Sequence, residues 1–114
     1  MQRDENLLID IAASAKRIVR FTANRTYDDF VQHEELQSAV IWQISVIGEA
    51  ARRVSEGLKE LYPEIPWFDM AGMRNRLIHD YSRIDYKQLW DTTQIDIPKL
   101  IKLIVPLIPA ADRP

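Results

Sequence analysis

The chain of 114 residues contains no cysteine, three glycines and two histidines, and each of these low counts excludes a class of structure or site. Without cysteine there is no disulfide and no thiolate metal site. Few glycines, with 46% hydrophobic residues, are typical of a folded helical domain rather than of a disordered chain. The sequence also lacks the run of about 20 apolar residues that a membrane span requires, and its N-terminus lacks the design of a signal peptide. We therefore expect one cytoplasmic domain, residues 1–114, without membrane association.

The net charge of −2 argues against a general nucleic-acid coat, because proteins of that class are usually clearly basic. The charges are nevertheless unevenly distributed. Residues 74–87 carry four basic side chains against two acidic ones. This local excess fits a selective phosphate-binding surface on a mildly acidic body, although ordinary charge mixing on solvated helix faces explains any single one of these residues equally well.

Apolar residues recur at steps of three and four along most of the chain, and no stretch alternates with the period of a strand. This pattern predicts an all-α fold, an up-and-down bundle of four to five helices with short connections. Prolines and capping residues delimit the helices. The expected helices cover roughly residues 5–23, 29–61, 67–80, 86–95 and 97–108.

The long helix expected at 29–61 carries an apolar seam of coiled-coil type. A second apolar face around Trp42 suggests that this helix also meets a partner chain. Gly48 is expected either to permit close helix approach or to be a tolerated weak position. Glu49 and Arg52 lie on the remaining face, where we expect solvated charges; the alternative for Glu49 is that it orients a catalytic group.

The chemistry of the sequence is concentrated in residues 73–81, Met-Arg-Asn-Arg-Leu-Ile-His-Asp-Tyr. His79 is the expected starting point of any reaction, because the other histidine, His33, is flanked by acids and predicted to be a surface residue without a role. Arg74 falls in the apolar stripe of its helix, where a packing salt bridge is the structural alternative to a functional role. On an ideal helix Arg74 and His79 are turned about 140° from one another, so a common target favours a dimer.

Elimination narrows the possible reactions. Two histidines without a carboxylate cluster argue against a metal site, and no cofactor-binding motif or nucleophile motif is present. An arginine and a histidine remain. This pair suits the cleavage of RNA without a metal, because the ribose 2′-OH supplies the nucleophile, a histidine can move the proton, and an arginine can neutralise the charge that builds on the phosphoryl oxygens.

The motif Arg74-x4-His79-x-Tyr81, with Asn75 after the arginine, resembles the R-x4-H-x-Y motif of HepT-like HEPN domains. The flanks at 62–67 and 85–90 are also similar to that family, and the resemblance covers nearly the whole chain. It implies a metal-independent ribonuclease toxin, a homodimer with the site across its interface, and a minimal nucleotidyltransferase antitoxin as partner.

The resemblance also implies a role for each motif residue. His79 would be the general acid/base and Arg74 the phosphate clamp, while Asn75 would assist orientation. Tyr81 would be AMPylated by the antitoxin, which would block the RNA groove with added bulk and negative charge. We add Arg76 as a secondary phosphate contact, with a surface pair to Asp80 as the alternative, and count Asp80 among the supporting residues.

Two non-catalytic interpretations remain open: a helical dimer that only docks a nucleotidyltransferase, and a bundle that helps to bind a nucleotide. The position of the two motif residues distinguishes the classes. An enzyme needs Arg74 and His79 exposed in a shared cleft, whereas a scaffold would bury them in intramolecular salt bridges.

Overall fold

The computed structural model describes the backbone of residues 2–79 and 81–114 and, within these ranges, all side chains except those of residues 2, 78, 79 and 81. The described residues are mostly helical and contain no strand. The first half comprises α1 (Gln2–Thr22), α2 (Tyr27–Gln32), α3 (Glu34–Arg53) and α4 (Glu56–Leu61). The second half comprises α5 (Trp67–His79), the 3-10 turn η1 (Tyr81–Arg83), α6 (Tyr86–Asp91), the π turn η2 (Thr92–Asp96), α7 (Ile97–Ile104) and two 3-10 turns, η3 (Val105–Leu107) and η4 (Ala110–Asp112).

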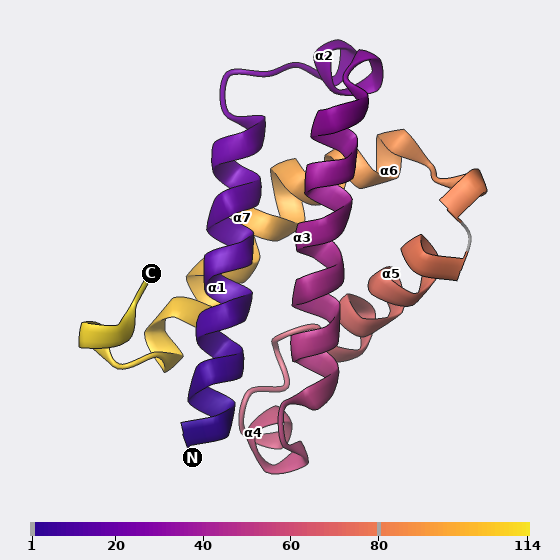
Figure 1. Ribbon diagram of the computed structural model, residues 1–114. Helices are drawn as coiled ribbons and strands as arrows, with labels where there is room; N and C mark the ends of the chain where they lie inside the picture. Colours follow the sequence, from indigo (N-terminus) through magenta and orange to yellow (C-terminus); the bar gives the residue numbers. More distant parts are fainter. Residues whose placement is uncertain (1, 80) are drawn as a thin grey trace.

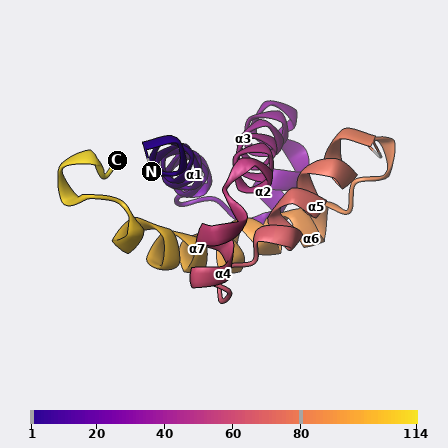
Figure 2. The same ribbon diagram turned by 90° about the horizontal axis from the view of Figure 1, so that it is seen from below.

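The helices form the expected all-α bundle. The helices α1 and α3 run side by side in opposite directions, with the short α2 at one end and α4 at the other (Figure 1). Seen from below, α6 and α7 cross beneath this pair as a second layer (Figure 2). The helix that carries the motif, α5, packs against α3, and its C-terminal end projects from the bundle.

The core forms where α1, α3 and α7 meet. Its members are buried side chains that recur at helical spacing, as the sequence predicted. They include Leu8, Ile11, Ala15 and Ile18 of α1, Val40, Ile44 and Ile47 of α3, and Leu100 and Ile104 of α7. Phe30 of α2 is also fully buried and packs against Trp90 of α6 at a ring-centroid distance of 5.3 Å, which ties one end of the bundle together.

The single helix expected at 29–61 is wrong, because three helices occupy this stretch. The first break is at His33, whose backbone is extended and whose Nδ1 accepts a hydrogen bond from the N–H of Leu36 at 3.0 Å. His33 is therefore the N-cap of α3, and the prediction that it has no role is wrong in structural terms. The cap of α2 is Thr26, which exchanges capping-box bonds with Asp29.

The second break, at Val54 and Ser55, follows from a contact distant in sequence. Ser55 donates its N–H and its hydroxyl to the carboxylate of Asp4, at 3.1 and 2.6 Å, and its Oγ caps α4. The apolar seam is buried as far as Val54, whereas Leu61, at the end of the expected helix, is 72% exposed.

The structure joins the two helices expected at 86–95 and 97–108 into one continuous helical segment. Ile97 donates its N–H to the carbonyl of Thr92, five residues back, which makes the turn at 92–96 a π turn. Pro98 follows in the first turn of α7, where its missing N–H is tolerated. The segment then narrows to the 3-10 turn at 105–107.

Candidate functional site

The site begins with the close approach of α3 and α5. A methyl group added at Gly48 would overlap the Cβ of Arg74 and come within 2.7 Å of the carbonyl oxygen of Met70. Only glycine fits this position of α3. Gly48 therefore permits the close approach of the two helices, which confirms one of the two expectations from the sequence. This approach places the stem of Arg74 against α3.

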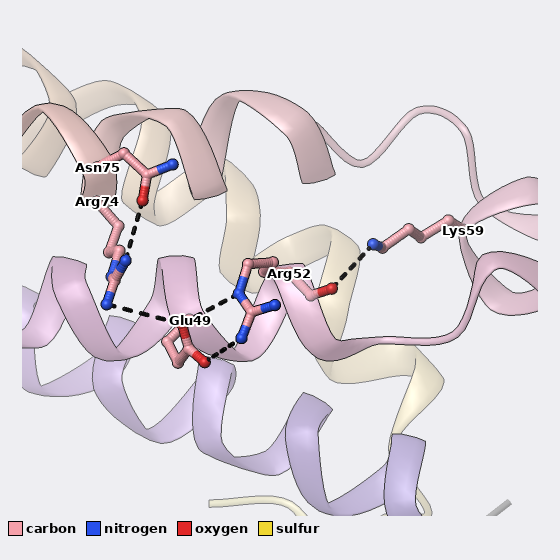
Figure 3. A network of polar contacts seen from close by, with 5 residues as sticks. All are labelled: Glu49, Arg52, Lys59, Arg74 and Asn75. Atoms are coloured by element: carbon pink, nitrogen blue, oxygen red, sulfur yellow. Dashed lines mark hydrogen bonds and ion pairs between the residues drawn. The ribbon is translucent and has the colours of Figure 1, made fainter.

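Arg74 lies along the surface of α3 with its guanidinium directed to Glu49 (Figure 3). Its Nη2 is 3.8 Å from Oε2 of Glu49, and its Nη1 donates to Oδ1 of Asn75 at 3.0 Å. Nε is buried and has no hydrogen-bond partner among the described residues. The side chain of Arg74 remains 29% exposed. The salt bridge considered as the structural alternative exists, but it is long and leaves part of the guanidinium accessible.

Glu49 is shared by two arginines. Arg52, one turn further along α3, donates to Glu49 at 2.6 and 3.3 Å, which is a much closer pairing than that of Arg74. The hydrogen bond from Arg52 lowers the pKa of the Glu49 carboxyl, with smaller contributions from the charges of Arg52, Arg74 and Arg53, and it raises the pKa of Arg52. Glu49 is therefore a firmly ionised carboxylate between two cations.

Arg76 does not join this cluster. Residues two apart on a helix are turned by about 200°, and Arg76 lines a cavity of about 700 Å³ on another side of α5. Apolar side chains of α3, α5 and α7, such as Ile44, Met73 and Leu100, contribute to the lining. The structure therefore separates Arg76 from Arg74, and the role of Arg76 as a secondary phosphate contact stays a prediction.

The remaining motif residues are placed only by their backbone. His79 is the last residue of α5, and Tyr81 is the first residue of η1. Asp80 lies outside the described residues, and so do the side chains of His79 and Tyr81. The expected roles of these three residues stay predictions.

Sequence reasoning missed Arg52 as a member of the cluster and assigned Glu49 mainly to solvent. The available signal was the spacing of three between them, which lets a glutamate and an arginine pair on one helix face. Nothing in the sequence indicated that α5 would bring Arg74 to the same carboxylate.

In the described part of the chain, no three His, Cys, Asp or Glu side chains are grouped so that they could hold a metal ion. Among the helices of residues 2–79 and 81–114, none has both the length and the hydropathy of a membrane span. What the arrangement offers chemically is a partly exposed guanidinium with N–H donors beyond those used by Glu49 and Asn75, suited to an oxyanion such as a phosphate.

Comparison with known proteins gives a consistent result. The family described as "Ribonuclease HepT-like" matches residues 11–107. A protein of Thermococcus cleftensis named "Probable ribonuclease HepT" is 42% identical over 96 residues, which cover 84% of this chain and 87% of that protein. "Putative RNase MJ1380" of Methanocaldococcus jannaschii is 40% identical over 95 residues, which cover 83% and 87% of the two chains. No solved structure gives a significant match.

Proposed function

The chain belongs to the HepT-like ribonuclease family, and from this membership we propose that it is a metal-independent endoribonuclease and the toxin of a toxin–antitoxin pair. Its substrate would be RNA, whose 2′-OH attacks the adjacent phosphate. The new bond joins the 2′ oxygen to phosphorus, and the bond from phosphorus to the 5′ oxygen breaks. The products are a 2′,3′-cyclic phosphate and a 5′-OH end.

His79 and Arg74 share the work of this reaction. His79 moves the proton from the attacking 2′-OH or to the leaving 5′ oxygen, as a general acid/base. Arg74 neutralises the charge that builds on the phosphoryl oxygens, and Asn75 helps to orient its guanidinium, to which it is hydrogen-bonded at 3.0 Å. Asp80 is assigned a supporting role with His79, its neighbour in sequence.

The observation that carries the proposal is the state of Arg74. A purely structural arginine in a helix interface is expected to be buried and closely paired. Arg74 instead keeps 29% of its side chain exposed, and its only carboxylate contact among the described residues is 3.8 Å long. A phosphate oxygen can therefore compete for this guanidinium.

We place the working site at the interface of a homodimer. Trp42 is 67% exposed and lies seven residues before Glu49, so both occupy nearly the same face of α3. By the same arithmetic Phe68, 88% exposed, shares the outward face of α5 with Asn75. Exposed aromatic residues beside the site are a common feature of protein interfaces. A second copy seated there would bring the His79 of one chain towards the Arg74 of the other.

The proposed antitoxin is a minimal nucleotidyltransferase that AMPylates Tyr81. The added nucleotide would place bulk and negative charge two residues after His79, where RNA phosphate must bind. This assignment rests on the motif and on family membership.

One observation favours the alternative of a non-catalytic module that docks a nucleotidyltransferase or helps to bind a nucleotide. Arg74 does take part in an intramolecular ion pair, with Glu49, as a scaffold residue would. The two functions differ in whether the protein alone cleaves RNA.

The test is cleavage of a generic RNA by the purified protein in EDTA. We compare wild type with Arg74→Ala and His79→Ala, and use Arg20→Ala and His33→Asn as matched controls that lie in other parts of the fold. The proposed function requires EDTA-resistant cleavage in wild type and both controls, its loss in both site variants, and 5′-OH products. Cleavage that EDTA abolishes, or that survives in the site variants, contradicts it. If wild type is inactive and intact mass shows no added nucleotide on Tyr81, the non-catalytic module replaces the enzyme.

A further inference from the structure

We propose that Glu49 is a positioning residue for Arg74 and that Arg52, by competing for the same carboxylate, keeps Arg74 exchangeable between Glu49 and a phosphate. This inference rests on the proposed function, since it takes an RNA phosphate as the ligand of Arg74. It assigns to α3 a part in the site that the motif on α5 does not contain.

The first support is the geometry of the three side chains (Figure 3). Oε1 of Glu49 is 2.6 Å from Nη2 of Arg52, while Oε2 is 3.8 Å from Nη2 of Arg74. A carboxylate prefers two close hydrogen bonds from one guanidinium, and Arg52 already supplies them. The contact to Arg74 is therefore loose because Glu49 is already engaged.

The second support is the unpartnered Nε of Arg74. This atom is buried and has no acceptor among the described residues, although every guanidinium N–H is a donor. The present conformation of Arg74 therefore leaves a hydrogen bond unmade. A phosphate offers two oxygens at the spacing of a guanidinium edge, so it can accept from Nε and Nη2 together once the side chain moves outward.

The third support is that the backbone fixes the stem of Arg74 against α3. Gly48, the neighbour of Glu49, lies against the Cβ of Arg74, so only the outer part of the arginine is free to move. Glu49 thus limits the directions that the guanidinium can take before RNA binds. Orientation of this kind raises the rate of the chemical step, while competition with phosphate weakens ground-state binding.

The two neighbours of Arg74 should then affect the kinetics in opposite ways. Glu49→Gln removes the competing charge and the anchor, so we expect the KM for RNA to fall about two- to fivefold and kcat to fall about tenfold. Arg52→Gln frees Glu49 to pair closely with Arg74, so we expect KM to rise about two- to fivefold with kcat little changed. A variant that only loses stability would lower the activity without a decrease in KM.

The first experiment reads Arg74 directly and needs no RNA. In ¹⁵N-labelled protein, the guanidinium signals of Arg74, assigned with Arg74→Lys, report rotation about its Nε–Cζ bond. We expect faster rotation in Glu49→Gln, slower rotation in Arg52→Gln, and no change in Glu56→Gln. The last variant is the matched control, because the Glu56 side chain is 84% exposed on α4 and pairs with Lys59, at 3.5 Å.

The second experiment measures kcat and KM of the same variants, after thermal unfolding has shown that each is folded. Opposite changes of KM in Glu49→Gln and Arg52→Gln support the proposal. Guanidinium signals that do not respond to Glu49→Gln, or KM values that change in the same direction, overturn it. If wild type cleaves no RNA, the proposed function fails, and the guanidinium signals alone then decide whether Glu49 positions Arg74.

Discussion

Gly48 of α3 and Arg74 of α5 approach so closely that the arginine stem occupies the space where a side chain at position 48 would begin. The helix that carries the motif is held at this point by steric fit, and the ion pair with Glu49 is formed by the next residue of α3. Two adjacent residues of α3 therefore contact Arg74, Gly48 by close packing and Glu49 by an ion pair.

This contact predicts that Gly48→Ala destabilises the protein, although alanine is the better helix former by about 1 kcal/mol. The added methyl group meets the Cβ of Arg74 and the Met70 carbonyl, and such overpacking costs about 1–3 kcal/mol. Gly57→Ala is the matched control, because a Cβ there has nothing within 4 Å and should be neutral or stabilising. Urea unfolding checks both. Equal stability of the two variants would contradict the close approach of α3 and α5.

A second prediction concerns Asp4, which is 6% exposed and accepts both hydrogen bonds from Ser55. Asp4→Asn should cost about 1–3 kcal/mol, because one oxygen acceptor and the charge are lost. Asp10→Asn, on the exposed side of the same helix, is the control. Urea unfolding at pH 7 gives the difference.

The same contact sets a pH dependence. The hydrogen bond from the Ser55 hydroxyl is the main cause that lowers the pKa of Asp4 below its ordinary value of 3.8. A lowered folded pKa means that the stabilisation is complete above 3.8 and is lost as the pH falls through the lower, folded value. The stability difference between wild type and Asp4→Asn should therefore be constant from neutral pH to about pH 4 and shrink below it. A difference that instead shrinks at neutral pH would exclude Asp4 as its source.

The cap at His33 gives a third prediction. His33→Ala leaves the Leu36 N–H without its acceptor and should destabilise the protein by about 1 kcal/mol. His33→Asn places an amide oxygen in the same position and should retain most of the stability. Thermal unfolding of the two variants separates loss of the cap from loss of the imidazole itself. The assignment fails if alanine and asparagine cost the same.

A fourth prediction tests the proposed homodimer. Trp42→Glu introduces a charge on the exposed face that also carries Glu49, and it should shift the protein towards monomer. Leu61→Glu, at a side chain 72% exposed at the end of α4, should leave the mass unchanged. Light scattering coupled to size-exclusion chromatography measures both. A Trp42→Glu protein with the same mass as wild type would remove this face from the interface.

The fold could be predicted where local pattern and tertiary packing agree. The spacing of Ile11, Ala15 and Ile18 marks α1 and its buried face, and the structure has both. At Val54 the apolar seam continues across a helix end, so periodicity could not indicate the break. The residue that holds the break is Asp4, which binds Ser55 from 51 positions away in sequence, and no local pattern contains it.

The site, too, could be predicted only in part. The position of Arg74 in an apolar stripe raised a salt bridge as one of two alternatives, and the bond to Asn75 lies within the motif itself. The partner of that salt bridge could not be predicted, because Glu49 reaches Arg74 only through the packing of α3 on α5. The motif also could not indicate that Arg76, two residues after Arg74, lines a cavity on another side of α5.

The π turn at 92–96 has a consequence for the comparison of related sequences. A ring closed between Thr92 and Ile97 encloses one residue more than an α-helical ring, so α6 and α7 together behave as a single helix with one inserted residue. Alignment methods usually place gaps in loops. A relative that lacks the extra residue would therefore have its one-residue gap inside a helix. An alignment that moved this gap to the nearest loop would misalign every residue between the loop and the π turn by one position.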